Sequence, residues 1–136
     1  MVKKDVTVNK LKEIARQLRT DIIQTTVWAG SGHVGGAMSA ADYLTALYFK
    51  YLDIDPNDCG KKDRDRFILS KGHSAVGYIP CLSLAGFFPK DELKNFNHFK
   101  SPFGMHPDGN KVPGCDCSTG SLGHGLPIGV GICLGA

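Results

Sequence analysis

The sequence has almost no excess of charge of either sign. Its 16 lysines and arginines are interspersed with 13 aspartates and glutamates, which leaves a formal net charge of +3. Proteins that bind nucleic acids or membrane surfaces usually carry a concentrated basic face, and no such cluster is present. We therefore expect neither a nucleic acid nor a membrane as a partner.

The amino-terminal stretch lacks the apolar core of a secretory signal. It reads MVKKDVTVNK, with charged residues but no apolar run after them, and this favours a cytoplasmic protein. The 42% of apolar and 21% of charged residues are typical of a soluble globular chain. A length of 136 residues suits one domain, so we expect residues 1–136 to form one domain or part of one.

The cysteines lack the dense, even-numbered pattern of a disulfide framework. There are five of them, and we expect reduced thiols. Cys115 and Cys117 are separated by one residue, whereas paired cysteines of structural zinc sites are usually separated by about two to four. A metal cluster completed by His106 and His124 is an alternative, but loop thiols are favoured over it.

Glycine, in contrast, is abundant. It accounts for 17 of the 136 residues, above the usual share of about 7%. The glycines gather in two stretches, residues 30–36 and 104–136. Because glycine lets another group approach the backbone closely, both stretches are candidate ligand-binding segments.

Apolar spacing and turn residues predict helices that alternate with a buried strand. Such a chain forms an α/β layer, in which ligands bind on loops at strand ends and at helix N-termini. The expected elements are a helix from about Leu11 to Trp28 capped by Asn9 or Thr7, a second helix from a capping box at Ser39–Asp42 to about Leu52, a polar loop over 53–66, a strand over 67–70, a helix over 74–85, a short helix after Pro89, a loop over 100–120 and a last helix over 126–136 packed closely against a neighbour.

Two familiar motifs match only in part. The glycines of Gly30-x-Gly32-x-x-Gly35 have the spacing of a dinucleotide-binding loop, but a helical pattern precedes them where a strand is required. An oxidoreductase is thus a distant alternative. The segment 53–57 opens like a calcium-binding loop, but the glycine and the glutamate of that motif are replaced by Asp58 and Arg64. We interpret it as a solvated turn.

Three of the five histidines lie in loops marked by glycine or proline. They are His33 in SGHVGG, His73 in SKGHS and His106 in GMHPDG. A single loop histidine is usually just solvated, but three together favour an active site, because imidazole exchanges protons near neutral pH. His98, beside a turn, is interpreted as solvated. His124 is either a helix-start residue or a ligand contact.

The segment SKGHS joins the predicted strand to a helix. A strand-to-helix turn offers free amide groups and the positive end of a helix dipole to an anion. Lys71 and His73 could add charge or hydrogen bonds there. The segment is therefore suggestive of phosphate binding, although such turns are also common without a ligand.

In combination, these motifs resemble those of one enzyme family. SGHVGG followed by Ser39 and Asp42, then RDRFILSKGHS, GMHPDG and STGSLGHGL, in this order, resemble the amino-terminal half of thiamine-diphosphate-dependent transketolases. The resemblance extends from about Leu11 to Ala136 and is strongest to the small amino-terminal subunit of split transketolases. The residues of SGHVGG and of RDRFILSKGHS favour a transketolase over a deoxyxylulose-phosphate synthase.

The resemblance implies a reaction and its catalytic residues. Transketolases move a two-carbon ketol unit between sugar phosphates, and the cofactor serves as the electron sink. By similarity, His33, His73 and His106 line the substrate channel. His73 would also lie close to the cofactor diphosphate, and His106 would contact the terminal hydroxyl of the donor sugar. Imidazoles on sugar hydroxyls suit the proton transfers of this chemistry.

The resemblance also implies a cofactor-binding loop. Gly120, Ser121 and Leu122 would run alongside thiamine diphosphate, with backbone groups at the aminopyrimidine and the leucine on the ring system. His124 would be a further contact. Many full-length relatives carry proline and glutamine where Ser121 and His124 stand, and these replacements keep the glycine frame.

Two further expectations concern the rest of the site. In the family, the metal that anchors the diphosphate, Mg²⁺, is held by a Gly-Asp-Gly segment and an asparagine that would lie beyond Ala136, so we expect no metal ligand in this chain and weak cofactor binding by it alone. A carboxy-terminal, pyrimidine-binding transketolase chain would complete the site for sugar phosphate substrates, in a homo- or hetero-oligomer.

The expected fold is the incomplete amino-terminal part of the family's thiamine-diphosphate-binding fold, a mainly parallel sheet with helices on both faces. The apolar stretch GVGICLGA favours a fragment of a longer subunit over a truncated product. The alternative function is a catalytically silent interaction module that keeps this fold without the metal site.

Overall fold

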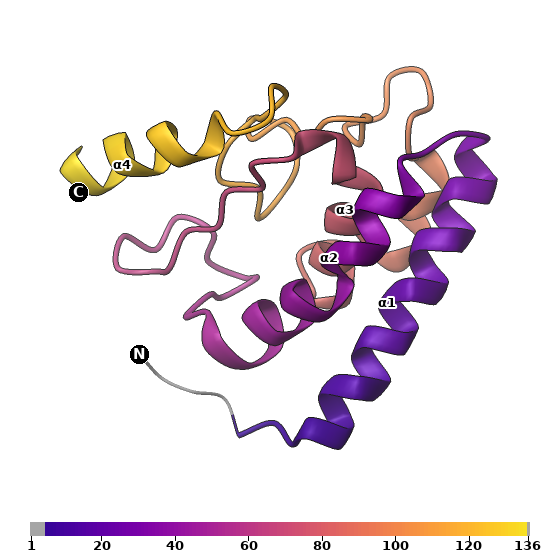
Figure 1. Cartoon of the computed structure of the whole chain (residues 1–136), viewed down its shortest axis with the longest axis horizontal. Coiled ribbons are helices and arrows are strands. Elements are labelled where there is room, and N and C mark those ends of the chain that lie inside the picture. Colours follow the sequence, from indigo (N-terminus) through magenta and orange to yellow (C-terminus); the bar gives the residue numbers. More distant parts are fainter. Residues whose placement is uncertain (1–4, 136) are drawn as a thin grey trace.

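The computed structural model describes residues 5–135. Helices α1, α2 and α3 pack against one another, and α4 extends from the opposite end of the molecule (Figure 1). Each of the first three contacts the other two, and the hydrophobic core lies between them. The elements are α1 Val8–Ala29, α2 Val34–Ala46, a π-helical turn Leu47–Tyr51, a 3₁₀ helix Gly72–Ser74, α3 Ala75–Leu84, a 3₁₀ helix Lys90–Asn95 and α4 Gly125–Gly135.

Helix α1 is the predicted first helix, with defined signals at both ends. The hydroxyl of Thr7 accepts a hydrogen bond from the amide of Lys10 at 3.2 Å, which makes Thr7 the N-cap, as one of the two predicted alternatives. Gly30 ends the helix in the left-handed conformation, with φ of 65°. Leu18 and Ile22 on its inner face are fully buried. The prediction of this helix is confirmed.

Helix α2 begins earlier than predicted. It starts directly after His33, so the predicted capping box at Ser39–Asp42 is wrong. The hydroxyl of Ser39 donates to the carbonyl of Gly36 inside the helix, at 3.0 Å, and Asp42 pairs with Arg19 of α1 at 2.5 Å. In the first turn of α2, Gly36 contacts Ser74 and His73 of the 3₁₀ helix Gly72–Ser74, and Ala37 packs against Gly77 of α3.

Helix α3 confirms the predicted helix over 74–85 and forms the centre of the core. Residues 75–83 are all buried. Tyr78 reaches from it to Tyr48, with a hydroxyl-to-hydroxyl distance of 2.8 Å, and also donates to the carbonyl of Gly114 at 3.2 Å. Burial raises the pKa of both tyrosines far above the usual value.

Residues 67–70 do not form the predicted strand. Alternate residues Arg66, Ile68 and Ser70 line one surface, as in a strand, but no ladder forms, because no second strand lies beside them within residues 5–135. Side chains supply bonds instead: the amide of Phe67 donates to Asp116 at 2.8 Å. The mainly parallel sheet that we predicted is therefore not confirmed by the described residues.

Helix α4 confirms the predicted last helix up to residue 135, and residue 136 lies outside the described residues. It meets the 66–70 segment through small residues: a methyl group on Gly129 would lie 3.6 Å from Cδ1 of Ile68. Its large side chains face outward, with Leu126 74% and Leu134 84% exposed. The expected close packing of this helix is thus absent within the part of the chain that is described.

The short helix predicted after Pro89 is the 3₁₀ helix Lys90–Asn95, with Pro89 as its N-cap. The predicted loop over 100–120 has no helix or strand.

Within residues 5–135, no helix combines the length and the apolar character that a membrane crossing requires.

The five cysteines are free, as predicted, and differ in exposure. Cys81 and Cys115 are buried, whereas Cys59 and Cys133 are exposed. Burial raises the pKa of the Cys115 thiol to about 11. Since the thiolate is the reactive form, iodoacetamide at about pH 8 should label Cys59 and Cys133 rapidly and leave Cys115 unlabelled until the pH approaches its pKa. Peptide mapping by mass spectrometry would check this, and equal labelling of Cys59 and Cys115 at pH 8 would contradict it.

Candidate functional site

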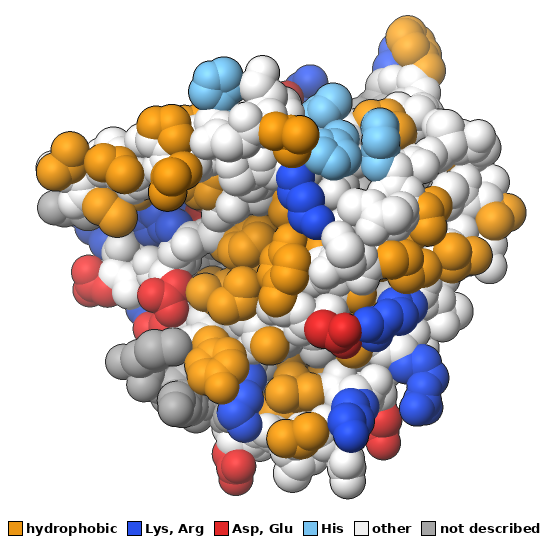
Figure 2. All heavy atoms as spheres, viewed as in Figure 1, with side chains coloured by type: hydrophobic (Ala, Val, Ile, Leu, Met, Phe, Trp, Pro, Cys, Tyr) orange, Lys and Arg blue, Asp and Glu red, His pale blue; other side chains and the backbone are white. Residues whose placement is uncertain are grey.

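Two of the three predicted catalytic histidines lie together. His33 is the N-cap residue of α2, and its exposed side chain makes no capping bond. His73 lies in the 3₁₀ helix Gly72–Ser74 and is half-buried. Their ring centroids are 5.3 Å apart, with an angle of 69° between the ring planes. Figure 2 shows histidine side chains side by side near the upper rim of this face, and another histidine set apart from them along the same rim.

The glycine-rich loop after Thr119 is tied to the turn that carries His73. The hydroxyl of Thr119 donates to the carbonyl of Leu69 at 2.5 Å. Its own carbonyl lies against Gly72, so closely that a methyl group at Gly72 would be 2.0 Å from it. The two segments are therefore in direct backbone contact, and this contact sets the distance of the loop from the histidine pair.

The predicted cofactor-binding residues line the open side of that loop. Gly120 has no atom within 4 Å of where its side chain would be, and Leu122 is 71% exposed. Ser121 and His124 are exposed as well, and His124 lies directly before α4. The loop is fixed from behind by Ser70, whose hydroxyl accepts from the amide of the first α4 residue at 3.0 Å. A flat ring system would find free backbone and an exposed leucine here, which fits thiamine diphosphate.

His106, the third predicted catalytic histidine, is exposed in the loop 104–109. No ring contact or hydrogen bond joins its side chain to His33 or His73 in the described part of the chain. Its loop is nevertheless linked to the start of the glycine-rich loop, since Ser118 accepts from the amide of Gly109 at 2.9 Å. The structure thus brings together His33 and His73 and leaves the role of His106 a prediction.

In this structure the ammonium group of Lys71 is bonded to α2, while its proposed contribution to phosphate binding stays a prediction. Its ammonium group donates to the carbonyl of Gly36 at 2.8 Å and to the hydroxyl of Ser39 at 3.0 Å. It also lies 5.8 Å from the ring centroid of Tyr43. Lys71 therefore joins the histidine turn to α2 in this structure, and an anion would compete with these bonds for its charge.

Ser74 is a residue of this site that the sequence analysis missed. Its side chain is buried, with the residue only 1% exposed, and its hydroxyl has no hydrogen-bond partner in the described part of the chain. It lies against Gly36, where a methyl group would be 2.5 Å from the Ser74 oxygen. The only sequence signal was its place beside His73, because contact with α2 depends on the tertiary fold.

His98 lies on an exposed turn, as predicted, and its Nε2 is 3.3 Å from the carbonyl of Trp28.

Within residues 5–135, no three histidine, cysteine or acidic side chains lie close enough together to hold a metal ion. Cys115 instead donates to the carbonyl of Cys117 at 3.4 Å. The described residues thus do not form the alternative zinc cluster.

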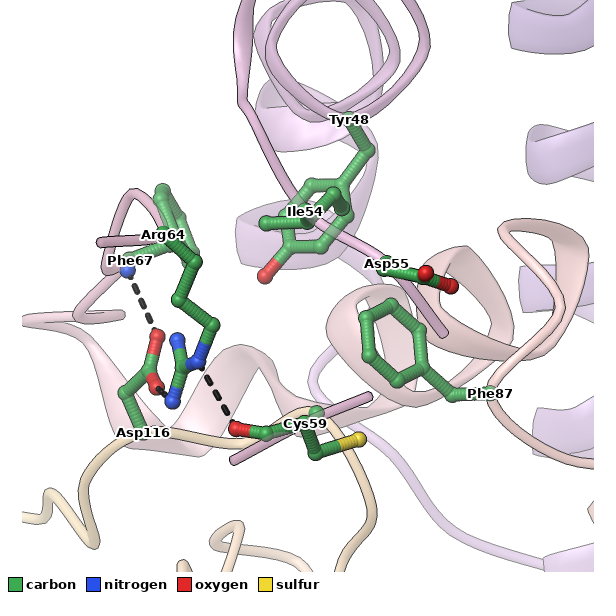
Figure 3. Close-up of a pocket in the computed structure, with 9 residues that line it drawn as sticks. Tyr48, Ile54, Asp55, Cys59, Arg64, Phe67, Phe87 and Asp116 are labelled. Atoms are coloured by element: carbon green, nitrogen blue, oxygen red, sulfur yellow. Dashed lines mark hydrogen bonds and ion pairs between the residues drawn. The ribbon is translucent and has the colours of Figure 1, made fainter. Parts of the chain in front are cut away.

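A second pocket lies away from the histidines, between the 53–66 loop and the core (Figure 3). Its polar groups satisfy one another. Asp116 accepts from Arg64 at 2.5 Å and from the amide of Phe67 at 2.8 Å, and Arg64 also donates to the carbonyl of Cys59 at 2.8 Å. The carboxylate raises the pKa of the Arg64 guanidinium. Because Arg64 and Asp116 are paired with each other and with backbone groups, this pocket is a structural part of the fold and a poor candidate for catalysis.

Solved structures with the same fold include transketolases. The chain superposes on a Pichia stipitis transketolase in complex with sedoheptulose 7-phosphate with a TM-score of 0.85 and 34% identity, covering 91% of this chain and 18% of that chain. For a transketolase from Campylobacter jejuni the TM-score is 0.84 at 30% identity, covering 93% and 20%. The histidine pair and the glycine-rich loop thus belong to an amino-terminal transketolase fold.

Residues 7–136 match the family described as "Transketolase, thiamine diphosphate binding domain", and the chain belongs to this family. It is 39% identical to one of the apulose-4-phosphate transketolase subunits of Actinobacillus succinogenes over 133 residues, 97% of this chain and 48% of that protein. It is 42% identical to a 6-deoxy-6-sulfo-D-fructose transketolase subunit of Clostridium sp., over 77% of this chain and 38% of that protein. The chain therefore spans less than half the length of these relatives, and the predicted resemblance to split transketolases is confirmed.

Proposed function

We propose that this chain is part of a thiamine-diphosphate-dependent transketolase that transfers a two-carbon ketol unit from a ketose phosphate to an aldose phosphate. The observation that carries the proposal is the histidine pair, His33 and His73, held beside a glycine-rich loop whose outer side is open. Residues 1–136 would form the amino-terminal part of the diphosphate-binding domain. Relatives that are named as single subunits of a transketolase support a second, pyrimidine-binding chain as partner in an oligomer.

The glycine-rich loop would hold the cofactor. Gly120 and Ser121 would offer backbone groups to the aminopyrimidine, Leu122 would pack on the ring system, and His73 and His124 would be polar contacts. When bound, thiamine diphosphate supplies the electron sink for breaking a carbon–carbon bond of the sugar. Mg²⁺ would take its ligands from outside the described residues.

The histidines would bind and deprotonate sugar hydroxyls. The rings of His33 and His73 lie 5.3 Å apart and form one rim, so a substrate over the loop would meet both rings. An imidazole can accept a hydroxyl proton and return it near neutral pH. His106, on a loop linked to the same rim, would contact the terminal hydroxyl of the donor sugar.

The test combines a diphosphate-binding subunit that contains residues 1–136 together with the rest of that domain and the pyrimidine-binding transketolase chain of the same organism, in the presence of thiamine diphosphate and Mg²⁺. We expect saturable cofactor binding by calorimetry and ketol transfer. Changing His106→Ala should lower turnover by about a hundredfold, a typical loss for a group that transfers protons, and leave the unfolding midpoint unchanged. His98→Ala, on a neighbouring exposed turn, is the matched control and should retain activity.

Unchanged turnover of the His106→Ala protein would contradict its proposed role. Absence of thiamine diphosphate binding with any partner chain would contradict the enzyme and favour an interaction module that keeps the transketolase fold.

A further inference from the structure

The first turn of α2 lies directly against the turn that carries His73. A methyl group at Gly36 would lie 2.5 Å from the hydroxyl of Ser74 and 3.4 Å from Nε2 of His73. From the same turn, Lys71 donates to the carbonyl of Gly36 at 2.8 Å. Gly36 is therefore contacted by residues both before and after Gly72, and it is the point where α2 and the histidine turn meet.

The adjacent glycine gives an internal comparison. Gly35 lies in the same turn of α2, but nothing lies within 4 Å of where its side chain would be. Adding a methyl group to either residue changes helix propensity by the same amount. Only the methyl group at Gly36 would enter the space between the helix and His73, so the two positions separate a helix effect from a contact effect.

Ser74 limits the room on the other side of this contact. Its side chain is buried, and its hydroxyl forms no hydrogen bond within the described residues. The Ser74 oxygen therefore fills space next to Gly36 without a bond to hold it. Removing an unpaired buried hydroxyl costs little, so Ser74→Ala would open room beside Gly36 at small expense.

We propose that Gly36 is a positioning residue for His73. The missing side chain lets α2 close on the histidine turn, and this closure sets the 5.3 Å distance between the rings of His33 and His73. His33 is attached to the start of the same helix, so any displacement between α2 and the turn changes the geometry of the pair. The consequence for catalysis rests on the proposed function, but the geometry of the pair can be measured without it.

The experiment compares four variants of the full chain: Gly36→Ala, Gly35→Ala, Ser74→Ala, and the double variant Gly36→Ala with Ser74→Ala. The ¹H–¹³C resonances of the two imidazole rings report their mutual position, because each ring lies in the magnetic field of the other. We expect Gly36→Ala to shift both resonances and Gly35→Ala to leave them in place. The double variant should bring them back toward those of Ser74→Ala, since the methyl group then occupies the space that the hydroxyl left.

A second readout is the affinity for thiamine diphosphate and Mg²⁺ of the variants placed in the complete diphosphate-binding subunit, with the partner chain present; it should weaken about tenfold in Gly36→Ala and recover in the double variant. If resonances shift and recover as expected but no variant binds the cofactor, the proposed function fails and the positioning role stands. If Gly36→Ala does not fold, a folded double variant with both resonances in place supports the inference. It is overturned if Gly36→Ala shifts the resonances no more than Gly35→Ala, or if the double variant shows no recovery.

Discussion

Replacing Gly72 by alanine should lower the free energy of unfolding by at least about 3 kcal/mol, at the upper end for a single added methyl group. The methyl group would lie 2.0 Å from the carbonyl oxygen and 2.6 Å from the carbonyl carbon of Thr119. Both are backbone atoms, so no side-chain rotation relieves the overlap. The glycine-rich loop would have to separate from the histidine turn, and the hydrogen bond from Thr119 to Leu69 would be lost.

Urea unfolding followed by circular dichroism measures this effect. The control is Gly131→Ala in α4, where no atom lies within 4 Å of the added methyl group. Because alanine favours a helix more than glycine does, this control should keep or raise stability by up to about 1 kcal/mol. A Gly72→Ala protein within about 1 kcal/mol of the parent chain would show that the two segments separate at little cost, contrary to the contact described here.

The helices could be predicted because their signals are local. Apolar spacing marks α1 in the sequence, and Thr7 caps this helix through its own hydroxyl. The beginning of α2 was missed for a physical reason: His33 makes no capping bond, and the first turn is held by contacts of Gly36 with the 3₁₀ helix Gly72–Ser74 and of Ala37 with Gly77 of α3. A cap motif at Ser39 was the stronger local signal, but tertiary contact overrides it.

The strand predicted over 67–70 fails for a different reason, because it depends on a partner far away in the sequence. The short apolar run 67–70 is typical of a buried strand, but a strand exists only where a neighbour supplies its hydrogen bonds. In the described chain, a carboxylate and a threonine hydroxyl provide bonds to this segment. The sequence can indicate that such a segment is extended and buried, but it does not say which group will hydrogen-bond to its backbone.

In the candidate site, too, some residues could be predicted from the sequence and others could not. Glycine-marked loops indicated His33 and His73, and the structure places their rings together. Gly36 and Ser74 were missed as a contact pair, because they are far apart in the sequence and meet only when α2 packs against the histidine turn. Loop composition therefore predicts which residues carry the chemistry, and packing decides which residues hold them in place.

Replacing Asp116 by alanine should cost about 3 kcal/mol of stability, because this carboxylate serves two partners in a site of low exposure. The side chain is 6% exposed, and that of its ion-pair partner Arg64 is 17% exposed. Removing one member of a buried pair leaves the other charge uncompensated, which typically costs about 3–5 kcal/mol. The remaining exposure of Arg64 reduces this penalty, whereas the amide of Phe67, which would lose its acceptor, adds to it.

Two further variants separate the charge from the hydrogen bond. Asp116→Asn keeps an oxygen that can accept from the amide of Phe67 but removes the charge opposite Arg64, so its loss of stability should be smaller than that of Asp116→Ala. Asp42→Ala breaks the exposed pair with Arg19 and should cost less than about 1 kcal/mol. Equal losses for Asp116→Ala and Asp42→Ala in urea unfolding would show that Asp116 is no more than a surface charge. The expected order would instead show that this one side chain holds the edge of the 67–70 segment, the position that a neighbouring strand takes in a sheet.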